Sequence, residues 1–142
     1  MKLVVDASVA LKWQFEEEED SQPALALLED FAEGRVDLIT VTLFSYEILS
    51  AINVAIARGR IGETAGQRAL IYLTSLGIEE ESFTDLIEGA FKIARKHGLS
   101  TYDSAYIALG EKERCDFYTG DKRLFHAAQK RLPWVKWIRN YS

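Results

Sequence analysis

Apolar residues occur along the chain as short runs and as longer stretches with helical spacing. The short runs predict β-strands at residues 2–6, 37–40, 117–119 and 135–138, with a polar edge strand at 78–81. The longer stretches predict helices at residues 7–15, 21–33, 42–57, 63–75, 84–97, 100–115 and 122–130, the second with Ser21 as N-cap and Pro23 in its first turn. Strands separated by helices need crossover connections. The pattern therefore predicts an α/β fold with a mainly parallel central sheet.

The size and composition of the chain suit one domain over residues 1–142. Its 48% hydrophobic and 11% aromatic content are typical of a globular protein with one core. The apolar runs are broken by charge well before the roughly 18 residues that a membrane span needs, and Met-Lys-Leu-Val-Val-Asp predicts a first strand rather than a signal peptide. The single cysteine excludes an intrachain disulfide, and with two histidines it makes a Cys/His zinc site unexpected. We therefore expect a cytoplasmic protein that does not contact the membrane.

Charge is unevenly distributed along the chain. Residues 1–50 hold three basic and eleven acidic side chains, a net of −8, and the remainder holds fourteen basic and eleven acidic, a net of +3. The acidic run at residues 16–20 is expected to be a solvated loop or helix end. The basic excess has two interpretations, solvated helix faces or a patch that touches a nucleic-acid backbone. Its residues are Lys92, Arg95, Lys96, Lys122, Arg123, Lys130, Arg131, Lys136 and Arg139.

Four carboxylates stand where a globular protein tolerates unpaired charge poorly: Asp6, Glu47, Asp103 and Asp121. Asp6 and Asp121 follow predicted strands, at the carboxyl edge where parallel sheets bind ligands. Asp103 opens a helix rich in Ala, Tyr and Ile. Glu47 lies in an apolar helix, and the residues three and four positions away carry no opposite charge. Gathered together, these carboxylates would repel one another and require a cation.

Helix capping is the alternative role for three of the four. Asp6 and Asp121 are each placed to be the N-cap of the helix that follows, and Ser100-x-x-Asp103 fits a capping box. Glu47 has no such explanation. A hard divalent cation prefers oxygen ligands, so the set of four predicts metal-assisted phosphate chemistry. Neither histidine lies beside a plausible nucleophile motif, and no P-loop or dinucleotide-binding glycine fingerprint occurs.

Four motifs carry a resemblance to a known family. They are Val4-Val5-Asp6-Ala7-Ser8-Val9-Ala10, Tyr46-Glu47-Ile48, Thr101-Tyr102-Asp103-Ser104-Ala105-Tyr106 and Tyr118-Thr119-Gly120-Asp121-Lys122-Arg123-Leu124. In order and spacing the chain resembles the PIN-domain nucleases, and among them the VapC-type toxins of bacterial and archaeal toxin–antitoxin pairs. The resemblance implies a three-layer α/β/α sandwich, Mg²⁺ or Mn²⁺ as cofactor, cleavage of single-stranded or structured RNA, a homodimer and a small DNA-binding antitoxin as partner.

The resemblance also assigns roles to individual residues. Asp6 and Asp103 are the expected direct metal ligands, and Glu47 and Asp121 complete the negative pocket directly or through water. Small hydroxyl side chains that would support these carboxylates are Ser8 and Thr119. Residues expected to contact the RNA backbone are Lys12, Lys122 and Arg123. Trp13 and Phe15 would either stack on bases at the rim or be buried.

Two other functions remain open from the sequence. A receiver-like signalling module also uses a parallel sheet and an acidic Mg²⁺ pocket, but it has no need of a helical acid such as Glu47. A catalytically idle PIN-like binding module is the other. For an antitoxin, we expect an Arg or Lys directed at the acids and an apolar groove near Trp13, Phe15, Leu25 and Leu28.

Overall fold

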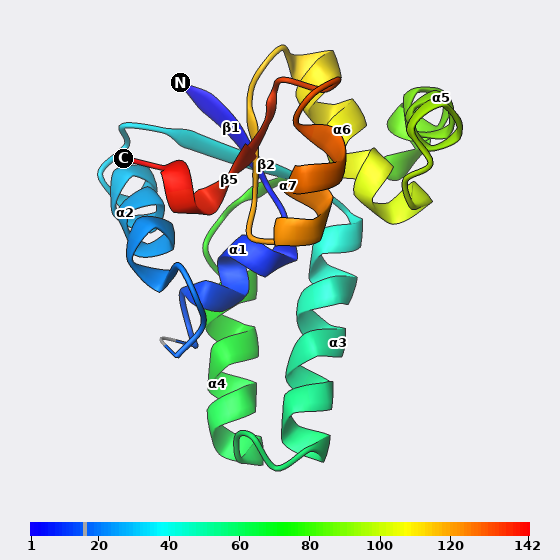
Figure 1. Cartoon of the computed structure of the whole chain (residues 1–142). Helices are drawn as coiled ribbons and strands as arrows, with labels where there is room; N and C mark the ends of the chain where they lie inside the picture. The colour runs from blue at the N-terminus through cyan, green and yellow to red at the C-terminus, as the bar shows by residue number, and fades with distance from the viewer. Residues whose placement is uncertain (16) are drawn as a thin grey trace.

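The computed structural model describes residues 1–15 and 17–142, and it contains a five-stranded sheet between two layers of helices (Figure 1). Glu16, the first residue of the acidic run, lies outside the described residues. The strands are β1 (Lys2–Val5), β2 (Asp37–Val41), β3 (Glu79–Glu81), β4 (Phe117–Thr119) and β5 (Val135–Trp137). Their order is β3-β2-β1-β4-β5, and every neighbouring pair is parallel. The predicted fold class is confirmed.

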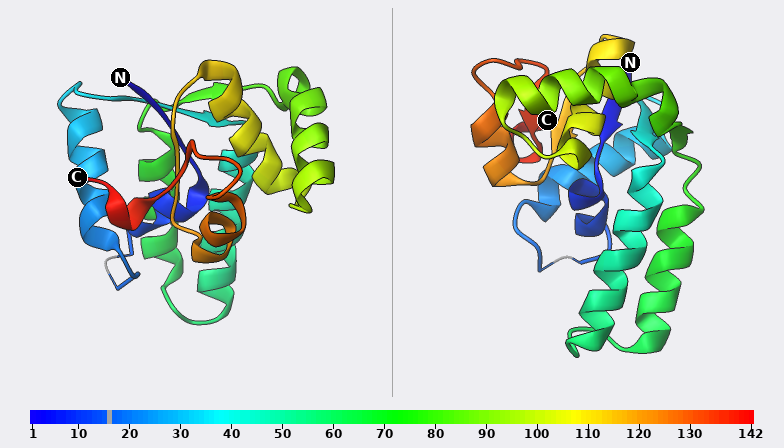
Figure 2. Two further views of the ribbon diagram at one scale, coloured as in Figure 1. Left: turned by 45° about the horizontal axis from the view of Figure 1, so that its top comes forward. Right: turned by 90° about the vertical axis from the view of Figure 1, so that its right-hand side faces the viewer.

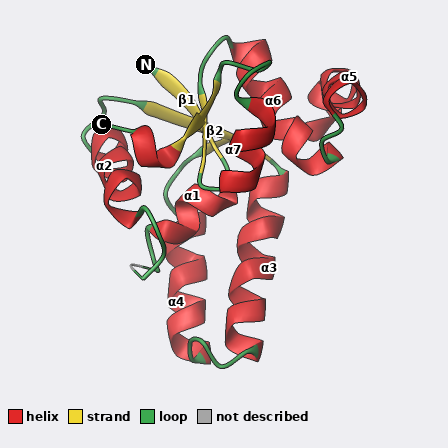
Figure 3. Cartoon of the chain, in the orientation of Figure 1, coloured by secondary structure: helices red, strands yellow, loops and turns green. Residues whose placement is uncertain are grey.

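Helices connect the strands and cover both faces of the sheet (Figure 3). They are α1 (Ala7–Lys12), α2 (Ser21–Ala32), α3 (Leu43–Ala57), α4 (Glu63–Thr74), α5 (Ile87–His97), α6 (Thr101–Glu113) and α7 (Lys122–Ala128), with 3-10 turns at Phe83–Leu86 and Ile138–Asn140. None of the helices in residues 1–15 and 17–142 is long and apolar enough to cross a membrane.

Two apolar cores lie on opposite faces of the sheet, because successive strand side chains point to opposite faces. Leu3 and Val5 of β1 pack with α1, α2, α3 and α4. Val4, between them, packs with Phe117, α6 and α7 on the other face, where α5 lies outside α6 (Figure 2). The central position of β1 between β2 and β4 thus brings the end of β1 next to the start of α1 and to the end of β4.

Helices α3 and α4 form a hairpin that projects beyond the sheet (Figure 1). Gly66 allows the close approach, because a Cβ there would lie 2.5 Å from Ile56 Cδ1. The base of α3 carries Glu47, so the hairpin places this carboxylate near the carboxyl edge of the sheet.

Several predicted boundaries were wrong in detail. The predicted helices 100–115 and 122–130 end at Glu113 and Ala128. Helix α1 ends at Lys12, and α2 already begins at Ser21, so its N-cap is Asp20, in the left-handed conformation with φ 64°. The predicted helix 84–97 is divided, because the Ser82 hydroxyl accepts from the Thr84 N–H and starts a 3-10 turn before α5. None of these changes moves a strand end that carries an acid.

Candidate active site

Asp6 is buried at the carboxyl end of β1, with 6% of its surface exposed. Its Oδ1 accepts from Ser8 Oγ at 2.5 Å and from the Val9 N–H at 3.2 Å. Its Oδ2 accepts from Thr119 Oγ1 at 2.5 Å. Asp6 therefore does cap α1, as the capping alternative predicted, and it is also held in a fixed orientation from β4.

The loop after β4 is attached to the loop after β1 through the same hydroxyls. The Gly120 N–H donates to Ser8 Oγ at 2.8 Å, and the Asp121 N–H donates to Thr119 Oγ1 at 3.0 Å. A Cβ at Gly120 would lie 2.6 Å from Lys12 Cε and 3.1 Å from the Ser8 carbonyl oxygen, so a larger residue does not fit without a shift. Ser8 and Thr119, the hydroxyl side chains that the resemblance placed beside the acids, thus both contact Asp6.

Glu47 is half-buried on α3 and accepts a short hydrogen bond from the Tyr106 hydroxyl. Tyr106 is 1% exposed, and its ring stacks on Phe117 with the centroids 5.6 Å apart. The sequence motifs had suggested no role for Tyr106. Its position three residues after Asp103 was the available signal, because such residues share one face of a helix.

Asp103 lies in the first turn of α6, and Asp121 is the N-cap of α7. The Asp103 N–H donates to Ser100 Oγ at 3.0 Å, which confirms the Ser100 half of the predicted capping box. Asp121 Oδ1 accepts from the N–H groups of Arg123 at 2.9 Å and Leu124 at 3.2 Å, so it caps α7. Asp103 is half-buried, whereas Asp121 is exposed.

The four carboxylates influence one another electrostatically. Burial raises the pKa of Asp6 to about 6, the hydrogen bonds from Ser8, Thr119 and Val9 oppose the rise, and the charge of Glu47 adds to it. Burial likewise raises the pKa of Glu47, with the charge of Asp103 adding to the effect. Burial raises the pKa of Asp103, and the charge of Asp121 adds to that. The negative charges therefore form a connected series in the order Asp6, Glu47, Asp103, Asp121.

The donor set in this series consists of carboxylate and hydroxyl oxygens, which suits Mg²⁺ or Mn²⁺. Within the described ranges, no three His, Cys, Asp or Glu side chains converge closely enough to form a metal site. The arrangement suits an ion held by one or two carboxylates with waters completing its shell, as Mg²⁺ is commonly held.

The three cations predicted to contact RNA differ in exposure. Lys12 is 6% exposed, and its Nζ donates to the Glu19 carbonyl oxygen at 2.6 Å. Lys122 and Arg123 are exposed, next to Asp121. Lys122 Nζ lies 5.9 Å from the Trp137 ring centroid. These two, rather than Lys12, are accessible to a ligand at the acids.

Trp13 and Phe15 are buried, with 4% and 7% of their surfaces exposed. Both belong to the core beneath α1 and α2, and Trp13 Nε1 donates to the Ala24 carbonyl oxygen at 2.7 Å. Of the two alternatives for these rings, burial is confirmed and base stacking at the rim is wrong.

Residues 3–130 match the PIN domain family. The chain belongs to the PIN-domain family. Relatives include Ribonuclease VapC3 of Pyrobaculum aerophilum, 32% identical over 126 residues that cover 87% of this chain and 92% of the relative. Ribonuclease VapC9 of Mycobacterium tuberculosis is 32% identical over 120 residues, which cover 80% of this chain and 92% of the relative. The receiver-like alternative is therefore excluded.

Solved structures share the fold. PAE2754 from Pyrobaculum aerophilum superposes with a TM-score of 0.69 at 23% identity, over 89% of this chain and 79% of that one. VapBC2 from Rickettsia felis, bound to a DNA fragment from its promoter, superposes with a TM-score of 0.63 at 13% identity. The match covers 96% of this chain and 97% of that one. A toxin–antitoxin complex from Klebsiella pneumoniae gives 0.61 at 16% identity, over 94% of each chain. At these identities the likeness concerns the fold.

Proposed function

We propose that this protein is a divalent-metal-dependent ribonuclease that hydrolyses phosphodiester bonds of single-stranded RNA and acts as the toxin of a toxin–antitoxin pair. The observation that carries the proposal is Asp6, a buried carboxylate oriented by Ser8 and Thr119 within the field of Glu47. A buried carboxylate beside further negative charge is stabilised by a cation. The names of the VapC relatives support RNA as the substrate.

Asp6 and Asp103 are the proposed direct ligands, and Glu47 and Asp121 complete the site directly or through water. When bound, Mg²⁺ or Mn²⁺ supplies an acidified water and stabilises charge on the scissile phosphate. The chain itself fixes the ligands beforehand. Ser8 and Thr119 hold both oxygens of Asp6, and such outer hydrogen bonds orient ligands and raise affinity for the ion.

Tyr106 has the corresponding role for Glu47. Its hydroxyl donates to Glu47 Oε1 from a ring that is fixed against Phe117, so the carboxylate is directed by a rigid partner. Lys122 and Arg123, exposed beside Asp121, are the proposed contacts for the RNA backbone.

A groove between α2 and α4 is the proposed seat of the antitoxin. Its volume is about 530 Å³, and its apolar walls include Leu25, Leu28, Phe31, Tyr72 and Leu76. An amphipathic helix suits such a groove, and an Arg of the same partner suits the acids because its planar fork binds carboxylates in pairs. The partner is tested by co-expression with the adjacent small reading frame. If the two proteins purify separately, and mixing them leaves RNA cleavage unchanged, the proposed antitoxin partner is contradicted.

An exposed apolar stripe formed by α5 and the 3-10 turn before it is the proposed homodimer contact. Phe83, Ile87 and Phe91 follow one another at intervals of four residues and are 38%, 51% and 61% exposed. This spacing places Ile87 and Phe91 on one side of α5, with Phe83 in the 3-10 turn that leads into it, and contiguous exposed apolar surface usually marks an interface.

The proposed activity is tested directly with purified chain and a labelled single-stranded RNA. Cleavage should appear with Mg²⁺ or Mn²⁺ and disappear with a chelator. Absence of cleavage with either ion, in a folded preparation free of antitoxin, would favour the idle binding module instead.

A further inference from the structure

A second cleft lies at the other end of α6 from the acids. It opens between α5, α6 and the connection from α7 to β5, and its volume is about 740 Å³. Lys92 and Lys96 from α5, Glu111 from α6, and Arg131, Leu132 and Trp134 from the connection line it. A cleft of this size is sufficient for a small ligand or for one unit of a polymer.

The cleft is separate from the candidate active site. Asp103 lies in the first turn of α6 and Glu111 in its last turns. Eight residues at about 1.5 Å rise each place them about 12 Å apart along the helix axis. A ligand in the cleft therefore does not contact the acids, although a nucleic-acid strand of a few units bridges such a distance.

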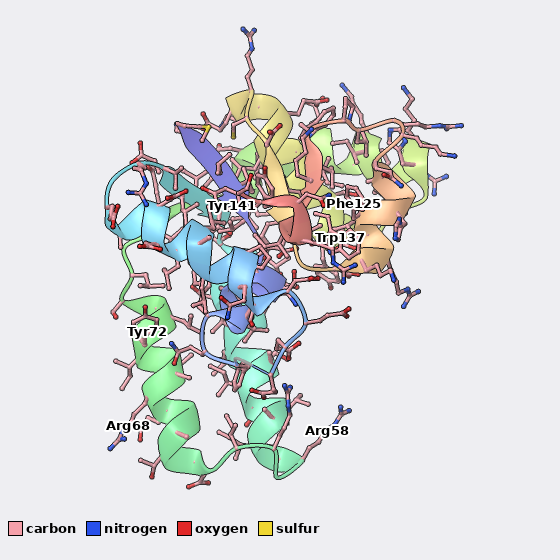
Figure 4. All side chains as sticks on the ribbon, turned by 60° about the vertical axis from the view of Figure 1, so that its left-hand side comes forward. Arg58, Arg68, Tyr72, Phe125, Trp137 and Tyr141 are labelled. Atoms are coloured by element: carbon pink, nitrogen blue, oxygen red, sulfur yellow. The ribbon has the colours of Figure 1, made fainter. Side chains whose placement is uncertain are left out.

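The rim of the cleft is cationic. Lys92 and Lys96 lie one turn apart on α5, and both are exposed, as is Arg131. In residues 1–15 and 17–142, none of these three forms an ion pair with a carboxylate. Glu111 is the opposing charge in the lining, so three cations face one carboxylate. Figure 4 shows nitrogen-tipped side chains gathered beside α5 and α7.

The wall of the cleft is aromatic and rigid. Trp134 Nε1 donates to the Ile107 carbonyl oxygen at 3.0 Å. A Cβ on Gly110 would lie 2.9 Å from Trp134 Cδ1, so this glycine allows the indole to lie against α6. Leu132 is buried beside it. A half-buried indole held in one orientation, next to free cations, presents a flat apolar face beside positive charge.

The cleft also stays clear of the proposed dimer contact. At about 100° per residue, Ile87 and Phe91 fall on one side of the buried stripe of α5, and Lys92 and Lys96 fall on the other. Association through the apolar stripe therefore leaves the cationic rim accessible.

We propose that this cleft is a second RNA-binding site, which holds one nucleotide of the substrate away from the cut. Its phosphates lie on Lys92, Lys96 and Arg131, and its base lies against Trp134. The inference rests on the proposed function for the identity of the polymer. A nucleotide matches both features, because its base stacks on an aromatic ring while its phosphate meets the cations. An acidic peptide matches the charge alone.

The test compares two double variants in an Asp103→Asn background, which keeps the RNA intact. K92Q/K96Q removes charge from the cleft, and R58Q/R68Q removes the same charge from the projecting hairpin, where Arg58 and Arg68 point outward (Figure 4). Affinity for a labelled single-stranded RNA of about 12 nucleotides is measured by fluorescence anisotropy at several salt concentrations. We expect K92Q/K96Q to weaken binding about tenfold and to reduce the salt slope by about 1.4, with R58Q/R68Q within about twofold of its parent.

Unchanged binding in K92Q/K96Q, or equal loss in both variants, would overturn the inference. Tight binding of a poly-glutamate peptide that K92Q/K96Q abolishes would overturn it too, in favour of a protein ligand. Cleavage by the wild-type chain, measured in parallel, separates the two proposals. RNA binding that depends on Lys92 and Lys96 without any cleavage leaves the site standing and removes the nuclease. Cleavage together with RNA binding that does not depend on these lysines leaves the nuclease standing and removes the second site.

Discussion

Thr119 Oγ1 lies 2.5 Å from Asp6 Oδ2, although 113 positions separate the two residues along the chain. The contact exists because β1 and β4 are parallel neighbours whose carboxyl ends meet. Thr119 also accepts from the Asp121 N–H, so one hydroxyl connects two of the four carboxylate-bearing positions. The orientation of Asp6 therefore depends on a side chain that is not itself an acid.

Replacing Thr119 by Val should reduce metal-dependent cleavage by about 10- to 100-fold, because Val keeps the shape and removes the hydroxyl that orients Asp6. Thr119→Ser keeps the hydroxyl and should restore most of the rate. Initial rates at matched Mn²⁺ test this. Equal rates for Thr119→Val and the wild-type chain would show that Asp6 needs no such support.

Mg²⁺ or Mn²⁺ should raise the melting temperature, because the ion binds the folded cluster and not the unfolded chain. At a concentration of about 100 times Kd the gain is about 2.7 kcal/mol. Glu47→Gln should diminish the gain, and Glu88→Gln, which removes an exposed carboxylate from α5, should not. A melting temperature unaffected by millimolar metal would count against a shared cation site.

Without metal, the free energy of unfolding should fall as the pH rises. The pKa of Asp6 is about 6 in the folded chain, above its ordinary value, so the folded state holds this proton more tightly. Asp6 therefore contributes about 3 kcal/mol to the free energy of unfolding below about pH 4, and this contribution is lost as the pH rises through about 6. The pKa values of Glu47 and Asp103 are raised in the same direction.

Urea unfolding in chelator at about pH 5 and about pH 7.5 measures this effect. Asp6→Asn should flatten the dependence. The hydrogen bond from Tyr141 lowers the pKa of Asp30, so Asp30 makes the free energy of unfolding rise with pH. Both the wild-type chain and Asp6→Asn contain Asp30, so its contribution cancels when the two are compared. The same pH dependence with and without Asp6 would contradict the assigned pKa.

Phe91→Asp should convert a dimer into a monomer, because it places a charge in the exposed stripe with Phe83 and Ile87. Light scattering after size exclusion measures the mass. Tyr72→Asp is the control, since Tyr72 is 39% exposed on α4 (Figure 4), away from α5. A wild-type monomer at tens of micromolar would refute the dimer, and a Phe91→Asp dimer would refute the contact.

Much of this fold could be predicted from sequence because its signals are local. Short apolar runs marked every described strand except β3, which was predicted as a polar edge strand, and the acids that follow β1 and β4 occupy the carboxyl edge that parallel topology predicts. The strand order is not local, since it depends on which edges pair after the helices have packed. The N-cap of α2 was misplaced by one residue because Asp20 and Ser21 are both favoured cap types. In the structure Asp20 is the cap, with φ 64° and no capping hydrogen bond from its side chain.

The candidate site was predictable in its acids and less so in its supports. Asp6 and Asp121 are both helix caps and members of the charged series, two roles that the sequence pattern had offered as alternatives. Tyr106 was missed because its partner Glu47 is on another helix, 59 positions away. Trp13 and Phe15 could not be assigned to core or rim by periodicity, since α1 is short and its exit is set by packing on α2.

The most direct test is metal-dependent cleavage of single-stranded RNA by the wild-type chain, Asp6→Asn and Asp103→Asn at matched protein and Mn²⁺. The two variants should lose at least about 100-fold in rate, because each removes a proposed ligand. Their melting temperatures in chelator should be equal to or above that of the wild-type chain, because less negative charge is gathered there. Cleavage by folded Asp6→Asn and Asp103→Asn at the wild-type rate would contradict the account.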